Sequence, residues 1–333
     1  MKAAVISSPG VVEVTTVADP SPGPREAVVA VTACGLCGTD LHILDGEFAP
    51  RLPVVPGHEF TGVVAAVGTG VDELAVGARV AVDPSLYCHE CHYCRIGRAN
   101  LCERWAAIGV STAGGAAEFA VAPAANCVPL PEHVRLADAA LIEPLSCAVR
   151  GYDVLRSALG AHVLIYGSGT MGLMMLQLAR VTGAVSVDVV DINQDRLATA
   201  KLVGAATAAS AAELARPEGW EIVIDATGNE AAISDGIGRV RPGGTFLQFG
   251  VASPAARVAI DPYRIYNKEI TITGSMAVLH SFERAAEMFA AGVLDPDVFI
   301  SHRLPLERYA DALEMFRTGQ GRKIQVLPQR PGG

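Results

Sequence analysis

The sequence lacks several features that mark whole classes of protein. Only 18% of its 333 residues are charged, no run of Lys or Arg stands out, and the net charge is -9. Nucleic acid and anionic membrane surfaces are therefore unfavourable partners. No apolar run reaches the roughly 18 residues that a membrane-spanning helix needs, and residues 1–10 carry one Lys without the apolar core of a signal peptide. We therefore expect a cytoplasmic protein without a membrane partner.

What is present points to an enzyme. Half of the residues are hydrophobic and 34 are glycine, which suits a densely packed α/β protein and argues against disorder. The length is enough for two domains with substantial cores. The eight cysteines are better explained as metal ligands and buried thiols than as disulfides.

The pattern of apolar segments changes along the chain. Residues 27–34 and 62–67 are short β-branched runs bounded by Gly and Pro, which predicts a β-rich first domain over residues 1–143. Pro144 is suited to open a helix over residues 145–155, because its missing N–H needs no partner at the first helical position. Residues 277–333 return to the pattern of the first domain.

Residues 144–276 differ from both flanking segments because predicted strands alternate with predicted helices. Such alternation indicates a parallel sheet with helices on both faces. The expected strands are 163–166, 186–190, 221–225, 244–249 and 269–274, and the expected helices between the first of them are 171–182 and 194–203.

A first metal site is indicated by two short segments. His58 and Glu59 are adjacent in P-G-H-E-F-T-G, and Cys37 precedes them in C-G-T-D-L-H. A thiolate, an imidazole and a carboxylate are all ligands that Zn²⁺ accepts, and three of them leave the fourth position open. An isolated His-Glu pair is more often a buried His beside a surface Glu, so this assignment depends on the rest of the chain.

A second set of possible ligands is the run C-x2-C-x2-C-x7-C. Four thiolates so close together can close a tetrahedral Zn²⁺ shell, which leaves no position for a substrate, so this metal would be structural. Iron–sulfur binding is the competing interpretation, and His89 and His92 between the cysteines are better explained as solvated loop residues. The four cysteines are Cys88, Cys91, Cys94 and Cys102.

The remaining cysteines offer weaker patterns. Cys34 and Cys37 form a C-x-x-C that could be a redox dithiol. Because Cys34 ends an apolar strand, we expect it to be a buried thiol and Cys37 to be a metal ligand. Cys127 and Cys147 have no partner pattern and are expected to be packing residues.

A dinucleotide site is indicated where the predicted strand 163–166 leads into G-S-G-T-M-G. In this sequence Gly167 permits a tight turn, Gly169 lets the backbone approach a pyrophosphate, and Gly172 allows close packing of helix and strand. Asp191 follows the next predicted strand, where a carboxylate can accept hydrogen bonds from ribose hydroxyls. The loop also includes Thr170 and Met171, at the helix N-terminus whose N–H groups face the phosphate. The alternative is a plain strand-turn-helix with an N-capping Asp.

With these motifs, the chain resembles the zinc-containing medium-chain alcohol dehydrogenases over nearly its whole length. The resemblance implies a GroES-like, β-rich catalytic domain, a Rossmann coenzyme domain with a doubly wound parallel sheet, and an active site in the cleft between them. It also implies homo-oligomers of two or four chains. The coenzyme is expected to be NAD rather than NADP, because Asp191 would face the 2′-phosphate of NADP with like charge. The catalytic zinc ligands would be Cys37, His58 and Glu59. Glu143 in I-E-P-L-S is a further acid where alcohol dehydrogenases carry Cys, so it competes with Glu59.

The resemblance also implies a reaction. Zn²⁺ lowers the pKa of an alcohol, and hydride passes from the alcohol carbon to nicotinamide C4. The proton would leave through Thr39, the coenzyme ribose and His42. A capped turn with a solvated imidazole is the alternative account of T-D-L-H. Further coenzyme contacts are expected from one helical residue and from residues that follow strands: Arg196, Thr227, Gly228, Phe249, Gly250, Ser275 and Met276.

The substrate is narrowed by two features. The E-P-L run at Glu143 resembles the sorbitol, arabitol and threonine dehydrogenase branch. The Arg-Tyr pair that sorbitol dehydrogenases carry after the last coenzyme-domain strand is absent from G-S-M-A-V-L-H, which argues against sorbitol itself. We therefore expect hydride transfer from a secondary alcohol of a polyol or sugar-like compound. Alternatives are a threonine or small secondary alcohol dehydrogenase and a non-catalytic nucleotide-binding protein on the same fold.

Overall fold

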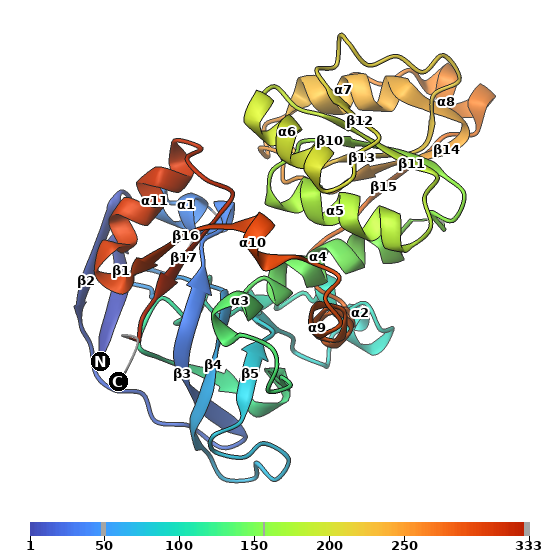
Figure 1. The fold of residues 1–333 in the computed structure, drawn as a ribbon. Helices are drawn as coiled ribbons and strands as arrows, with labels where there is room; N and C mark the ends of the chain where they lie inside the picture. Colours follow the sequence, from blue (N-terminus) through green and yellow to red (C-terminus); the bar gives the residue numbers. More distant parts are fainter. Residues whose placement is uncertain (48–50, 156, 330–333) are drawn as a thin grey trace. The chain divides into compact units, whose positions relative to one another are not determined.

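Two units make up the chain in a computed structural model that describes residues 1–47, 51–155 and 157–329. Unit 1 consists of Met1–Ser146 and Val278–Gly333, and unit 2 consists of Cys147–Ala277. The chain thus leaves unit 1 once and returns to it, so that the ends of the sequence belong to the same unit (Figure 1).

Unit 1 is built around a seven-stranded sheet in the order β16-β17-β3-β4-β5-β9, with β8 also paired to β3. Strand β3 (Glu26–Gly35) is central and pairs antiparallel with β4 (Glu59–Val67), β8 (Phe119–Pro123) and β17 (Lys323–Leu327). The predicted strands 27–34 and 62–67 are confirmed as parts of β3 and β4. The other strands of unit 1 are β1 (Lys2–Ser8), β2 (Val11–Thr16), β5 (Arg79–Val82), β6 (Ser85–Leu86), β7 (Ala106–Ala107), β9 (Cys127–Pro129) and β16 (Ile300–Pro305).

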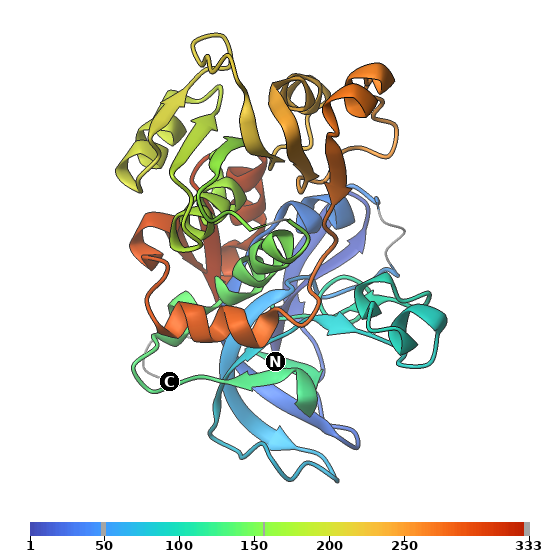
Figure 2. The same ribbon diagram turned by 90° about the vertical axis from the view of Figure 1, so that its right-hand side faces the viewer.

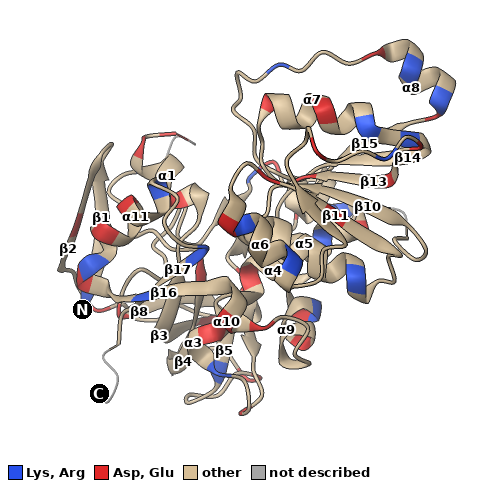
Figure 3. Cartoon of the chain, turned by 45° about the horizontal axis from the view of Figure 1, so that its top comes forward, with Lys and Arg blue, Asp and Glu red and all other residues tan. Residues whose placement is uncertain are grey.

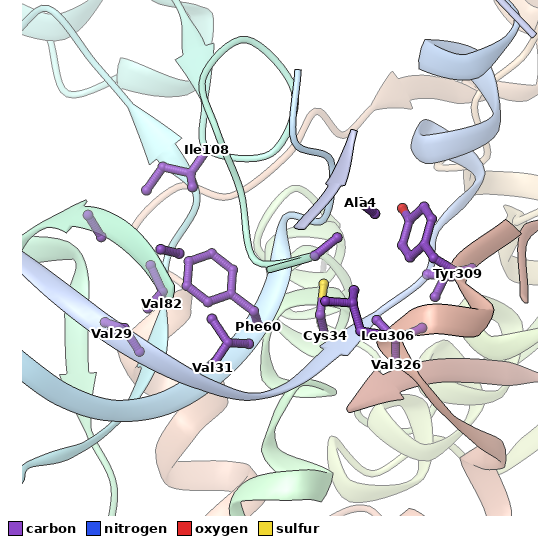
Figure 4. Close-up of a cluster of buried hydrophobic side chains, with 14 of the residues drawn as sticks. Ala4, Val29, Val31, Cys34, Phe60, Val82, Ile108, Leu306, Tyr309 and Val326 are labelled. Carbon is purple, nitrogen blue, oxygen red and sulfur yellow. The ribbon is translucent and has the colours of Figure 1, made fainter. Parts of the chain in front are cut away.

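The core of unit 1 lies against one face of this sheet. Val29, Val31, Phe60 and Val326 point into it from three strands, and the Cys34 sulfur lies among them (Figure 4). Helices and 3-10 turns complete the unit: α1 (Gly38–Leu44), α2 (His92–Arg95), η1 (Ala99–Leu101), η2 (Ala124–Asn126), α3 (Leu136–Ala139), α9 (Phe282–Ala290), α10 (Pro296–Phe299), η3 (Leu306–Arg308) and α11 (Tyr309–Arg317).

Unit 2 confirms the predicted alternation. Its six strands are all parallel, in the order β12-β11-β10-β13-β14-β15, and helices cover the sheet on both faces (Figure 1). This is the doubly wound arrangement expected from the sequence. Its elements are β10 (His162–Tyr166), α5 (Thr170–Val181), β11 (Ser186–Val190), α6 (Gln194–Leu202), β12 (Thr207–Ala209), β13 (Trp220–Asp225), α7 (Glu230–Arg239), β14 (Val240–Gln248), α8 (Pro262–Lys268) and β15 (Thr271–Gly274).

The predicted starts of three elements were wrong, and the first of them is β14, which begins at Val240 instead of residue 244. Helix α4 runs over Ile142–Asp153, so Pro144 is its third residue and does not open it. The N–H groups of a helix's whole first turn lack intrahelical partners, so Pro is tolerated there as well. Glu269 does not begin β15 but ends α8 in the left-handed conformation, with φ of 49°.

The charge pattern agrees with the expectation from composition. Lys and Arg positions are interspersed with Asp and Glu in Figure 3, and no basic stripe follows any element that the structure describes. None of the described helices is both long and apolar enough to cross a bilayer.

Candidate active site and coenzyme loop

Cys37 is positioned by the N-terminus of α1. It is the N-cap residue, and its backbone N–H donates to Oδ2 of Asp40 at 2.9 Å, one half of a capping box. The Sγ of Cys37 lies 3.7 Å from Oγ1 of Thr39. The short helix therefore holds the thiol and the hydroxyl beside each other.

His58 is positioned by a turn that only glycine permits. Gly57 has φ of 93°, and a Cβ there would meet Sγ of Cys34 at 2.5 Å and the backbone N of Ala116 at 2.8 Å. The backbone N–H of Gly57 donates to Oδ1 of Asp40 at 3.2 Å. Asp40 therefore joins the segment of Cys37 to the segment of His58.

Asp40 was missed in the sequence analysis although it lies between residues that were chosen. Its side chain is fully buried, and this burial raises the pKa of Asp40. A local signal existed, because an acid three residues after an N-cap position is typical of a capping box. That it also binds Gly57 could not be inferred, because that contact depends on the fold.

The three predicted ligands converge in unit 1. One ligand atom each of Cys37, His58 and Glu59 lies within 4.8 Å of the others, and His58 and Glu59 are buried. Nδ1 of His58 has no hydrogen-bond partner among the described residues and lies 3.9 Å from Oδ1 of Asp40. The imidazole nitrogen of His58, the thiol of Cys37 and the carboxylate of Glu59 together are a set of ligands that fits Zn²⁺.

Electrostatics around His58 favour a cation. Burial alone would lower the pKa of His58, but the Cys37 thiolate, Asp40 and Glu143 raise it well above its usual range. The same negative charges would stabilise a bound metal cation. Glu143 is buried in the first turn of α4 and lies outside the three-residue cluster.

Glu59 has a partner that the sequence analysis missed. Nζ of Lys323 lies 2.7 Å from both carboxylate oxygens of Glu59 and donates to the carbonyl of Leu36 at 3.0 Å. Burial would lower the pKa of Lys323, but Glu59 and Cys37 raise it above its usual range. Both side chains are almost fully buried, at 4% and 1% exposure. Glu59 is thus shared between the metal cluster and a buried ion pair.

The predicted proton route begins inside the unit and ends at its surface. Nδ1 of His42 lies 2.5 Å from Oε2 of Glu47, and the side chains are 39% and 57% exposed. Thr39 lies one helical turn away on α1, beside Cys37.

The four cysteines of the second set form a separate cluster. Their sulfur atoms lie within 4.8 Å of one another, with Cys88 to Cys94 and Cys91 to Cys102 both at 3.9 Å. The backbone N–H groups of Glu90 and Cys91 lower the pKa of Cys88 to about 5, so this sulfur is readily a thiolate. We call residues 88–102 the cysteine lobe; its teal ribbon stands out from the sheet in Figure 2.

Cys34 and Cys127 are buried, as expected of packing residues. Cys34 is fully buried, and this burial raises its pKa well above the usual range, which argues against a redox dithiol with Cys37. Burial also raises the pKa of Cys127 to about 12. None of the described cysteines is joined in a disulfide.

The glycine loop lies between β10 and α5, as predicted. Gly167 has φ of 92°. A Cβ on Gly172 would meet the carbonyl oxygen of Gly167 at 1.8 Å, so only glycine lets the helix approach the strand. A Cβ on Gly169 would meet no atom within 4 Å, which leaves open space beside the N-terminus of α5. Thr170 and Met171 form the first turn of that helix.

Asp191 follows β11 and is held by three hydrogen bonds. Its Oδ2 accepts from the backbone N–H of Ser168 at 2.7 Å and from Oγ of Ser168 at 2.8 Å. Its Oδ1 accepts from the N–H of Asn193 at 2.9 Å. The N-cap of α6 is Asn193, whose side chain accepts from the backbone N–H of Arg196. Asp191 is therefore not the N-capping residue of the alternative interpretation.

The remaining predicted coenzyme residues meet at the carboxyl edge of the same sheet. Asp225, which the sequence analysis missed, is fully buried and organises them. Its carboxylate accepts from Thr227, Gly228 and Gln248, and its carbonyl accepts from Phe249 and Gly250. The backbone N–H of Ser275 donates to the carbonyl of Gln248 at 3.2 Å, and Met276 is 42% exposed. An acid at the carboxyl end of a buried strand was the signal.

Comparisons with known proteins identify the family of the chain. The family model described as Alcohol dehydrogenase GroES-like domain matches residues 23–132, and that described as Zinc-binding dehydrogenase matches residues 170–291. D-arabinitol dehydrogenase 1 of Uromyces fabae is 38% identical, over 91% of this chain and 90% of its own. D-altritol 5-dehydrogenase of Agrobacterium fabrum is 39% identical, over 87% and 88%.

Two further proteins are similar over almost the full length. L-threonine 3-dehydrogenase of Saccharopolyspora erythraea is 35% identical, over 97% of this chain and 98% of its own. A solved structure of a zinc-binding dehydrogenase from Sinorhizobium meliloti 1021, bound to NADP, superposes with a TM-score of 0.94 at 33% identity, over 98% and 99% of the two chains. The chain therefore belongs to the zinc-dependent medium-chain dehydrogenase family and to its polyol dehydrogenase branch.

Proposed function

We propose that the protein is a zinc-dependent oxidoreductase that transfers a hydride from a secondary hydroxyl of a polyol or sugar-like compound to NAD. The observation that carries this proposal is the buried cluster of Cys37, His58 and Glu59 with the charge of Glu143 beside it. The names of the arabinitol and altritol dehydrogenases support the same substrate class.

The chain's own residues have distinct roles in this reaction. Cys37, His58 and Glu59 would hold Zn²⁺, which when bound supplies a Lewis acid that lowers the pKa of the substrate hydroxyl. Asp40 holds the backbone at Cys37 and Gly57 and so positions two of the ligands. Thr39 would accept the hydroxyl proton, and His42, which pairs with Glu47 at the surface, would release a proton to solvent when the ribose of a bound coenzyme links the two residues.

A second Zn²⁺ in the cysteine lobe is structural. Four sulfur ligands, from Cys88, Cys91, Cys94 and Cys102, complete a tetrahedral shell and leave no position for substrate. Low thiol pKa at Cys88 favours the thiolate that a metal requires. This metal would hold the lobe together and take no part in the reaction.

NAD is the coenzyme because of the charge at Asp191. An NADP 2′-phosphate there would face a carboxylate of like charge, whereas a ribose hydroxyl can donate to Oδ1. The glycine loop would hold the pyrophosphate at the N-terminus of α5. Arg196, Thr227, Gly228, Phe249, Gly250, Ser275 and Met276 would make the remaining contacts.

Glu143 gives the site its preference for adjacent hydroxyls. A second hydroxyl of the substrate can donate to this buried carboxylate, and a mono-alcohol cannot supply that hydrogen bond. Ser275, Met276 and Ala277 stand where sorbitol dehydrogenases carry their Arg-Tyr pair. We therefore favour another polyol, a sugar derivative or a simple diol over sorbitol.

A threonine dehydrogenase is the second candidate, because a relative with that name covers nearly the whole chain. A panel of pentitols, hexitols, inositols, butanediol, isopropanol and threonine, assayed for NADH production, separates the two. We expect the best polyol to exceed isopropanol by at least about a hundredfold in kcat/KM, and Glu143→Gln to reduce that ratio without changing NAD affinity. Activity on threonine alone favours the second candidate, and zinc without turnover on any alcohol favours a non-catalytic protein.

We also infer a cytoplasmic location and a homo-oligomer of two or four chains. Eight free thiols suit a reducing compartment. Strand β15 is an edge of its sheet, and Tyr263, Tyr266 and Ile272 near it are 71%, 82% and 41% exposed, as expected for a surface that another chain covers. Light scattering of the purified protein tests the second inference.

A further inference from the structure

The hydrogen bonds of Asp191 are unevenly distributed over its two oxygens. Oδ2 accepts twice from Ser168, through the backbone N–H at 2.7 Å and the hydroxyl at 2.8 Å. Oδ1 accepts once, from the N–H of Asn193. Because a carboxylate offers about four lone-pair positions, Oδ2 is saturated and Oδ1 has one position left for a ligand.

The Ser168 side chain lies in a buried turn that restricts the direction of its hydroxyl. Ser168 is fully buried between the two glycines of the loop, and Gly167 is fixed in the left-handed region by its φ of 92°. Asp191 is also nearly buried, at 8% exposure. Neither side chain can turn toward solvent without breaking the contact, so the negative charge stays at one position of the sheet edge.

We propose that Ser168 is a positioning residue that sets coenzyme specificity by fixing the Asp191 carboxylate through Oδ2. The inference rests on the proposed use of NAD. With Oδ2 held, Oδ1 faces the coenzyme ribose and accepts one hydroxyl, and the carboxylate cannot rotate away from a 2′-phosphate. Without the Ser168 hydroxyl, one of the two anchors of Oδ2 is lost, and the charge can move aside.

The test is the ratio of dissociation constants for NADPH and NADH, measured by coenzyme fluorescence on the purified protein. In wild type we expect NADPH to bind about a hundredfold or more weakly than NADH. In Ser168→Ala we expect that ratio to fall about tenfold, which is the effect of one hydrogen bond to a charged group. Ser186→Ala is the control, because it also removes a serine hydroxyl from this sheet but one that contacts His162. This variant should leave the ratio of dissociation constants unchanged.

Two further variants separate positioning from general loosening of the loop. Ser168→Cys keeps most of the side-chain volume, but its thiol is a weak hydrogen-bond donor. It should therefore also lower the ratio of the NADPH and NADH dissociation constants, even if Ala at this buried position lowers stability. In an Asp191→Ser background, Ser168→Ala should have no additional effect on the ratio, because the two residues act as a unit.

Equal weakening of both coenzymes in Ser168→Ala would overturn the inference, since it would show only a structural role for the loop. An additive effect of Ser168→Ala in the Asp191→Ser background would also overturn the inference. The same holds if wild type prefers NADH and Ser168→Ala leaves the ratio of dissociation constants unchanged. A wild type that binds neither coenzyme, or prefers NADPH, would overturn the proposed use of NAD and this inference with it.

Discussion

At the scale of single residues, two buried charged side chains hold the segments that carry the candidate metal ligands. Asp40 binds the backbone at Cys37 and at Gly57, and Lys323 binds both oxygens of Glu59. Neither charge was expected to matter from the motif alone. Their burial makes each contact strong, because an unpaired ion in the interior is costly.

The Glu59–Lys323 pair allows a direct test of this cost. In metal-free protein, Lys323→Met leaves the Glu59 carboxylate buried without a cation, so we expect the free energy of unfolding to fall by about 3 kcal/mol. Urea denaturation measures the change through the midpoint of the transition. Lys323→Met combined with Glu59→Gln should recover part of the loss, because the unpaired charge is then absent.

Lys2→Met is the matched control, because Lys2 and Glu307 form an ion pair of 2.6 Å whose side chains are 47% and 46% exposed. An exposed pair contributes little, so this variant should unfold near the wild-type midpoint. A Lys323→Met protein as stable as wild type would mean that the buried pair does not form.

At the scale of elements, continuous motifs were predictable and contacts between distant segments were not. The glycine loop and the cysteine lobe each lie on one short stretch of chain, so spacing alone located them. Lys323 reaches Glu59 only because β17 pairs with β3 and β3 with β4. Helix α4 begins at Ile142, before Pro144. The sequence could not distinguish these positions, because no N–H group of the first helical turn has an intrahelical acceptor and Pro is tolerated throughout that turn.

The cysteine lobe and the cluster of Cys37 should respond differently to the loss of one thiol. Cys91→Ala removes a ligand from a closed shell whose metal contributes folding free energy. We expect it to lose one zinc and to lower Tm by about 5–10 °C. Cys37→Ala should also lose one zinc and all turnover, yet keep a Tm close to wild type because α1 retains its Asp40 cap.

Zinc content by mass spectrometry and thermal unfolding of the two variants together check this contrast. Wild type should contain two zinc ions per chain. One or no zinc in freshly purified protein that has met no chelator would contradict both assignments, and equal Tm values for the two variants would contradict a structural role for the lobe.

At the scale of the whole molecule, the candidate metal ligands and the proposed coenzyme residues belong to different units. The possible metal ligand groups lie in Met1–Ser146, and among the described residues of Cys147–Ala277 no group of three or more His, Cys, Asp or Glu could hold an ion. The glycine loop, Asp191 and Asp225 all lie in unit 2. The C-terminal segment returns to unit 1 and supplies Lys323.

This division predicts the outcome of metal removal. Dialysis against a chelator that removes the catalytic zinc should abolish polyol oxidation, because Cys37, His58 and Glu59 would then hold no Lewis acid. NADH should still bind within about twofold of its original affinity, since one hydrogen bond lost in unit 2 would already cost more than that. Coenzyme fluorescence titrated before and after chelation measures the affinity, and zinc added back should restore turnover without changing it. Loss of NADH binding along with the zinc would mean that the metal site organises the coenzyme site, and the separation inferred from the two units would then be wrong.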